Sequence, residues 1–164
     1  MLDETVLNKY YGEIANKLDE IIPCEWEKIY LYVSELGNWS FATFYFYTSD
    51  GKCHHWGDIA DEYGMHIREL SGKTDELSQI SKQLWLECKE AWEEPWYSFT
   101  FSLDIDWKFN IKYGYEKNEE LSGKELQVRW AYDELGIVPS GKMGKRLLKK
   151  YLEEQDKDIP EELR

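Results

Sequence analysis

The chain has 164 residues, the length of one ordinary domain, and 42% of them are hydrophobic, which is enough for a sizeable core. Its 33 acidic residues outnumber its 20 basic ones, so the formal net charge is −13 and the pI is near 4.7. This charge repels nucleic acids and anionic membranes, which argues against both as direct partners and favours a basic partner. Aromatic residues make up 16% of the chain, and such side chains supply much of the energy of cores and interfaces.

The sequence also bears on the compartment. Its first residues contain no basic cluster followed by an apolar run, and no apolar run approaches the roughly 20 residues that span a bilayer. Its three cysteines, Cys24, Cys53 and Cys88, are widely spaced and predict neither a disulfide framework nor a CxxC site. We therefore expect a cytoplasmic protein with free thiols.

The N-terminal third predicts a helix followed by a hairpin. Apolar residues recur at steps of three and four from Asp3 to Ile22, the period of an amphipathic helix, and Pro23 ends it. Two runs of β-branched and aromatic residues follow, Glu27–Glu35 and Ser40–Thr48, with a short turn between them. A short third strand is expected at Cys53–Trp56.

The middle of the chain predicts a second helix and a second hairpin. Residues Asp58–Gly72 show no clear period, whereas Thr74–Trp92 carry an apolar stripe at helical spacing. After Pro95, the segments Trp96–Leu103 and Lys108–Glu116 alternate apolar and polar residues, as expected for antiparallel strands with one solvated face.

The C-terminal part predicts two further helices, Lys124–Leu135 and Gly144–Gln155, and a charged tail from Asp156 that frays. No linker divides the chain, so residues 1–164 are predicted to form a single α+β domain. Its expected order is an N-terminal helix, an antiparallel sheet of four to five strands interrupted by a helix, and two C-terminal helices.

No catalytic motif is present: GxGxxG, Walker, GxSxG and HExxH sequences are all missing. His54, His55 and Asp58 are metal-ligand residue types, but adjacent side chains on a strand point to opposite faces and do not converge on one ion. Asp104 and Asp106 are interpreted as turn formers. We therefore predict no catalytic residue, no metal site, no cofactor and no enzymatic activity, with a metal-dependent enzyme as the third-ranked hypothesis.

Three segments, Tyr11–Tyr32, Glu94–Glu116 and Arg129–Pro139, resemble the YezG/EsaG-like immunity (antitoxin) proteins of Gram-positive bacteria. The most specific pieces are IPCEWEKIY at Ile22–Tyr30 and EPW at Glu94–Trp96. The resemblance covers nearly the whole chain. It implies a non-enzymatic cytoplasmic protein that binds and neutralises a toxin exported by a type VII secretion system. In the best-known members the C-terminal domain of that toxin is a DNA-cleaving nuclease.

A nuclease domain must be basic to hold phosphates, so it suits an acidic inhibitor. The shared motifs are interpreted as folding elements, with Trp26 and Trp96 in the core. Residues that face the toxin are expected to vary between related copies and thus to lie outside those motifs. The expected places are the segment His54–Trp56, the hairpin tip Asp104–Trp107 and the acidic loop Glu116–Glu120. The predicted toxin-binding residues are His55, Trp56, Asp104, Asp106, Trp107, Glu116, Glu119 and Glu120.

Two questions stay open at this point. Inhibition could block the toxin's active site, act beside it or remodel the toxin. The second-ranked hypothesis is a non-catalytic interaction or regulatory domain with another partner, for example a homodimer joined through the strand Phe41–Tyr47, which is apolar on both faces. A monomer or a weak homodimer is expected.

Overall fold

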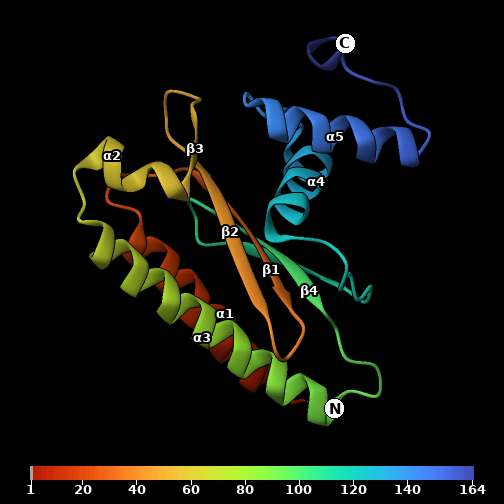
Figure 1. The fold of residues 1–164 in the computed structure, drawn as a ribbon. Helices are drawn as coiled ribbons and strands as arrows, with labels where there is room; N and C mark the ends of the chain where they lie inside the picture. Colours follow the sequence, from red (N-terminus) through yellow and green to blue (C-terminus); the bar gives the residue numbers. More distant parts are fainter. Residues whose placement is uncertain (1) are drawn as a thin grey trace. The chain divides into compact units, whose positions relative to one another are not determined.

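The computed structural model describes residues 2–164, which form two compact units, one ending at Lys117 and the other running from Asn118 to Arg164 (Figure 1). Each unit has its own hydrophobic core. The α+β class, the antiparallel sheet interrupted by helical structure and the two C-terminal helices are all confirmed. That residues 1–164 act as one domain stays a prediction.

The first unit begins with helix α1 (Glu4–Ile21), within one residue of the predicted bounds at each end. The side chain of Asp3 caps its N-terminus by accepting a hydrogen bond of 2.9 Å from the backbone N–H of Thr5. One face of α1 is fully buried because its apolar residues repeat at helical spacing.

Five strands form one antiparallel sheet in the order β3-β2-β1-β4-β5. Each strand matches its predicted segment to within two residues at either end. Their bounds are Lys28–Glu35 for β1, Ser40–Tyr47 for β2, Cys53–His55 for β3, Ser98–Asp104 for β4 and Phe109–Gly114 for β5.

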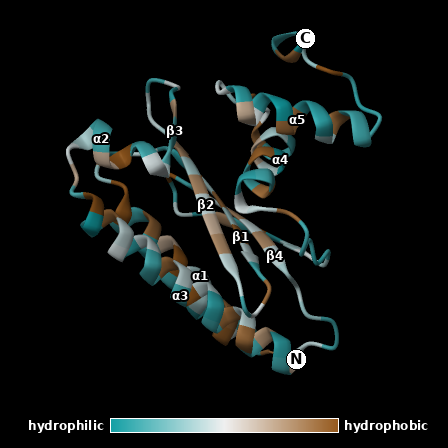
Figure 2. Ribbon diagram, viewed as in Figure 1, coloured by the Kyte–Doolittle hydropathy of each residue, from teal (hydrophilic) through white to brown (hydrophobic). Residues whose placement is uncertain are grey.

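One face of the sheet packs against α1 and α3 (Ile67–Ala91), which lie side by side across it (Figure 1). Side chains alternate along a strand, so each of the three central strands sends a separate set of apolar residues to this face. Figure 2 shows hydrophobic and hydrophilic positions interspersed along the two helices. The buried residues of the face are Ile29, Leu31, Val33, Phe44, Phe46, Phe99, Phe101 and Leu103. Trp26 and Trp96 join this core, as predicted.

The segment without a clear period folds into a 3-10 turn, Trp56–Asp58, and the short helix α2, Ile59–Tyr63. Helix α3 then begins at Ile67, seven residues before the predicted start at Thr74. The apolar period of the sequence does not mark this first turn, because Ile67 is exposed. The helix begins there with a cap, in which His66 Nδ1 accepts the backbone N–H of Arg68 at 3.1 Å.

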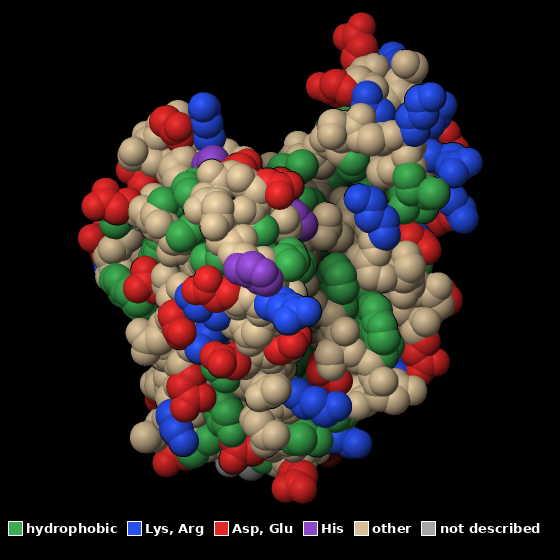
Figure 3. All heavy atoms as spheres, turned by 60° about the vertical axis from the view of Figure 1, so that its left-hand side comes forward, with side chains coloured by type: hydrophobic (Ala, Val, Ile, Leu, Met, Phe, Trp, Pro, Cys, Tyr) green, Lys and Arg blue, Asp and Glu red, His purple; other side chains and the backbone are tan. Residues whose placement is uncertain are grey.

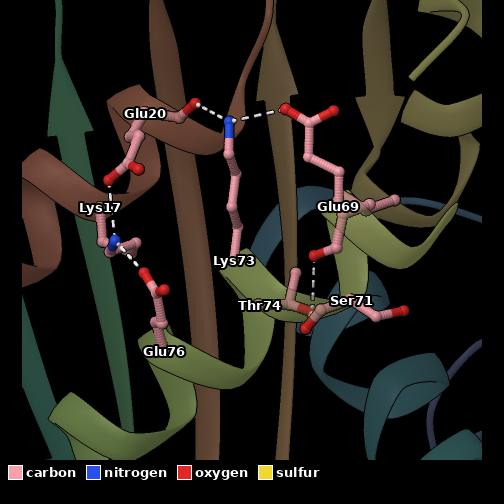
Figure 4. A network of polar contacts seen from close by, with 8 residues as sticks. Lys17, Glu20, Glu69, Ser71, Lys73, Thr74 and Glu76 are labelled. Atoms are coloured by element: carbon pink, nitrogen blue, oxygen red, sulfur yellow. Dashed lines mark hydrogen bonds and ion pairs between the residues drawn. The ribbon is translucent and has the colours of Figure 1, made fainter. Parts of the chain in front are cut away.

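Polar contacts join α1 to the first half of α3 (Figure 4). The ammonium of Lys17 pairs with Glu20 at 2.7 Å and with Glu76 across the helix interface. Lys73 reaches the carboxylate of Glu69 at 3.5 Å and the backbone carbonyl of Glu20 at 3.4 Å. Exposed ion pairs contribute at most about 1 kcal/mol each, so the apolar core carries most of the stability of this helix pair.

The second unit consists of α4 (Gly123–Leu135), α5 (Lys142–Glu154) and a 3-10 turn at Glu161–Leu163. Ser122 caps α4 at its start and Gly136, in the left-handed conformation, ends it. The tail that was expected to fray carries this 3-10 turn, and its Leu163 is buried with Val128, Leu148 and Leu152. Among residues 2–164 no helix is long and apolar enough to cross a membrane.

Two leucines on α3 test the orientation of this helix. Leu84 is fully buried against the sheet, whereas Leu86, half a turn away, is 40% exposed. We expect Leu84→Ala to lower the free energy of unfolding by about 2–5 kcal/mol, because it leaves a cavity. The matched change Leu86→Ala should alter it by no more than about 0.5 kcal/mol. Urea denaturation followed by far-UV circular dichroism measures both, and equal losses would contradict the observed face of α3.

Candidate partner-binding site

The eight residues predicted to face a partner come from several elements of the two units. His55 lies on the edge strand β3 and Trp56 directly follows it, whereas the turn with Asp104, Asp106 and Trp107 joins β4 to β5, the strand at the other edge. Glu116 follows β5, and Glu119 and Glu120 belong to the second unit. Within the first unit the rings of His55 and Trp56 lie 5.7 Å apart, and the three hairpin residues come together in one turn. The role of all eight residues as toxin contacts stays a prediction.

His55 and Trp56 have contacts within the fold. The Nε2 atom of His55 lies 3.0 Å from the hydroxyl of Thr43, and its Nδ1 accepts the backbone N–H of Gly57 at 3.2 Å. The indole of Trp56 stacks on Phe44 with 6.4 Å between ring centroids. Both side chains therefore help to attach β3 and the following turn to the sheet.

The histidines next to each other on β3 have separate surroundings. The Nδ1 atom of His54 lies 2.9 Å from the Glu62 carboxylate, and its ring stacks on Phe46. His55 instead contacts Thr43 and Gly57. Within residues 2–164, no group of three or more His, Cys, Asp or Glu side chains is placed to hold a metal ion.

The strand that is apolar on both faces, β2, lies inside the sheet. It pairs with β1 along its whole length and with β3 over Tyr45–Tyr47. A second copy therefore cannot add a strand to β2 on the side of β1, nor over Tyr45–Tyr47 on the side of β3. On one face of this strand Phe44 and Phe46 are buried, whereas Phe41, Tyr45 and Tyr47 on the opposite face are only half-buried. The oligomeric state stays a prediction.

The turn between β4 and β5 is tightly ordered by its own residues. The Asp104 carboxylate accepts the backbone N–H groups of Asp106 at 2.9 Å and of Lys108 at 3.0 Å, so Asp104 is the turn former that the sequence predicts. The backbone N–H of Trp107 donates to the carbonyl of Asp104 at 2.9 Å. The turn projects Ile105 and Trp107, which are 61% and 46% exposed.

Trp107 adopts an unfavourable backbone conformation, with φ at +62°. The left-handed region costs a residue with a Cβ roughly 1–2 kcal/mol, and glycine or asparagine is usual there. A large exposed aromatic side chain thus stands at a position where the backbone favours glycine. Strain of this kind concentrates at functional positions.

Beside this turn lies an open groove of about 760 Å³. It is formed by the last turn of α1, the loop that connects α1 to β1, and the β4–β5 turn, all within the first unit. These segments meet because β1 begins at Lys28, which is paired with Asp104 at the end of β4. The lining residues are Asp19, Ile22, Pro23, Cys24, Glu25, Trp26, Ile105 and Trp107.

The two tryptophans form the centre of the groove. The indole of Trp26 contacts that of Trp107 edge to face, with ring centroids 6.1 Å apart. The Nε1–H of Trp26 donates to Asp19 at 2.9 Å, which fixes the ring. The Sγ atom of Cys24 lies 3.4 Å from the hydroxyl of Tyr63 on α2, and the hydrogen bond between these two groups, together with burial, raises the pKa of Tyr63 to about 12.

Charge alone does not locate a site on this unit. Residues 1–117 contain 22 acidic and 11 basic residues, and Figure 3 shows acidic side chains spread over the face that α2 and α3 present. The groove differs because carboxylates lie beside the exposed indole of Trp107 there, and interfaces commonly combine aromatic residues with a polar rim. The hairpin tip is predictable from the sequence, whereas Asp19, Glu25 and Trp26 are not predicted to lie beside it, because they reach the tip only through the packing of α1.

Comparison with known proteins identifies the family. The family model described as "Immunity protein YezG-like" matches residues 7–149, which include the whole of the groove. The chain therefore belongs to the YezG-like immunity protein family, and the resemblance seen in its sequence motifs is confirmed.

Its relatives are of similar length. The chain is 30% identical over 168 residues to the immunity protein YezG of Bacillus spizizenii, a match that covers 96% of this chain and 100% of the relative. It is 31% identical over 145 residues to the immunity protein YezG of Bacillus subtilis, covering 87% and 96%. It is 29% identical over 145 residues to the type VII secretion system protein EsaG of Staphylococcus aureus, covering 85% and 87%.

The backbone strain at position 107 is open to direct measurement. Trp107→Gly and Trp107→Ala lose the same indole contact, and they differ only in the Cβ that makes a positive φ unfavourable. We expect the glycine variant to be the more stable by about 0.5–1 kcal/mol, after allowing for the greater freedom of unfolded glycine. Chemical denaturation of the two variants side by side gives this difference. An alanine variant as stable as the glycine variant would show that the turn carries no such strain.

Proposed function

We propose that this protein is an immunity protein that binds a nuclease toxin stoichiometrically and neutralises it without catalysis or a cofactor. Membership of the YezG-like family supports the immunity role. The charge supports a basic nuclease as the target, because residues 1–117 hold twice as many acids as bases. Opposite charges accelerate the encounter of two such proteins well beyond the rate for neutral surfaces.

The proposed toxin is one exported by a type VII secretion system, and the proposed site of action is the cytoplasm. The name of the Staphylococcus aureus relative supports this association with type VII secretion. A protein in this role protects the cell from a nuclease before export. It contacts the toxin and not the DNA, which its own negative charge repels.

The observation that carries the proposed binding surface is the exposed Trp107 beside Trp26, flanked by carboxylates. Tryptophan is enriched among the few residues that dominate the energy of protein interfaces. Asp104 orders the turn that presents it, and Asp106 adds a carboxylate at the tip. His55, Trp56, Glu116, Glu119 and Glu120 are proposed as separate contacts with the toxin, outside this groove.

The first test is DNA cleavage by the C-terminal nuclease domain of the toxin encoded beside this chain, titrated with the purified protein. We expect cleavage to stop near one equivalent. Trp107→Ala should raise the concentration for half-inhibition at least about 30-fold, since loss of a central interface tryptophan typically costs 2 kcal/mol or more.

Trp39→Ala is the matched control for this titration. Trp39 is 38% exposed and its ring stacks on Phe41, but it lies in the β1–β2 turn at the opposite end of the sheet. This variant should inhibit like the unchanged protein. Equal inhibition by the Trp107 and Trp39 variants would move the interface elsewhere, and unabated cleavage with excess unchanged protein would remove this nuclease as the target.

The same assay addresses how inhibition works. If the acidic side chains occupy the phosphate sites of the nuclease, then a higher DNA concentration should displace the inhibitor and restore cleavage. Inhibition that is independent of DNA concentration would instead indicate binding beside the active site or a remodelled toxin.

A further inference from the structure

We infer that the groove between Trp26 and Trp107 is a recognition pocket for an arginine side chain of the partner. This inference rests on the proposed function, because it takes the toxin as the source of the arginine. It goes further in naming one chemical group, a guanidinium, and the side chains of this protein that bind it.

The exposed indole of Trp107 provides the surface on which a flat cation packs, and the buried indole of Trp26 supports it. Trp26 and Trp107 meet at an interplanar angle of 62° and so form a corner, with Trp107 the more exposed of the two. A guanidinium within about 6 Å of an indole face is attracted by the electron density of the ring. Ile22, Pro23 and Ile105 complete an apolar lining against which the methylene stem of an arginine can pack.

Two carboxylates of the groove have acceptor capacity left over. Asp19 accepts the indole N–H of Trp26 through Oδ1, and its Oδ2 has no partner among the described residues. The Glu25 carboxylate likewise makes no hydrogen bond or ion pair to any residue from 2 to 164. No Lys or Arg lines the groove, so its two negative charges are not neutralised from within.

This combination selects arginine over lysine. A guanidinium is planar, so it can stack on an indole and at the same time donate two parallel N–H groups to a carboxylate. A lysine ammonium is a compact and strongly hydrated charge that matches only the carboxylates. A basic nuclease surface carries such side chains, which makes the groove complementary to the proposed partner in charge.

The test uses N-acetyl-arginine amide as the probe and the full-length protein labelled with ¹⁵N. Indole N–H resonances are assigned with single Trp→Phe variants and followed by NMR during the titration. We expect saturable shifts of the Trp26 and Trp107 signals and none of the Trp39 signal. N-acetyl-citrulline amide, the neutral isostere, should give no saturable shift, and N-acetyl-lysine amide should bind at least fivefold more weakly.

The carboxylates are tested with the double variant Asp19→Asn, Glu25→Gln, which should weaken arginine amide at least tenfold. Glu27→Gln, an exposed carboxylate outside the groove lining, serves as the matched control and should bind normally. Three results would each overturn the inference: the citrulline amide binds as tightly as the arginine amide, the lysine amide does so, or the double variant binds the arginine amide as tightly as the unchanged protein does.

This experiment separates the inference from the proposed function. Arginine amide binding that is absent, while Trp107→Ala still impairs neutralisation, overturns the pocket and leaves the immunity role standing. Binding that is present, while the double variant neutralises the toxin as well as the unchanged protein does, supports the pocket and removes the toxin as the source of the arginine.

Discussion

The burial of one face of the five-stranded sheet under α1 and α3 is the constraint on which the first unit depends. Every apolar position of that face on β1, β2 and β4 alternates with a residue of the opposite face, so a one-residue slip of any strand would send the wrong set of side chains into the core. The register in turn fixes the ends of the strands. Because β1 starts opposite the end of β4, the loop after α1 must lie beside the β4–β5 turn. The groove is therefore a consequence of how the core is packed.

Much of this architecture could be predicted from local patterns. Strands with alternating or uniformly apolar residues and helices with a clear apolar stripe, such as α1, were located to within two residues. The start of α3 was missed because its first turn is defined by the His66 cap and carries an exposed isoleucine, so no periodicity marks it. Glu116–Gly123 reads as an acidic loop inside one domain, and the contacts of Leu163, Leu148 and Val128 show that the last helices have a core of their own.

The sequence predicts only part of the candidate site: the residues that are neighbours along the chain, and not those that lie far from them in sequence. Asp104, Asp106 and Trp107 are neighbours in one turn, whose chemistry is local. Asp19 and Trp26 are brought to that turn by tertiary packing, which no short pattern records. Trp26 was assigned to the core, and it is buried there, yet one edge of its ring faces Trp107 in the groove. A single residue can therefore stabilise the fold and shape a surface, and burial does not separate the two roles.

The β4–β5 turn is closed entirely by its own groups, the carboxylate of Asp104 and the backbone bonds of Asp104, Trp107 and Lys108. Positions 105 and 106 make none of the side-chain contacts that hold it, so they are free to change without cost to the core. In a family of related copies, such a turn is a place where recognition can diverge rapidly on an unaltered scaffold. Under the proposed function, substitutions at positions 105 and 106 would change which toxin the protein recognises and leave its core unaltered.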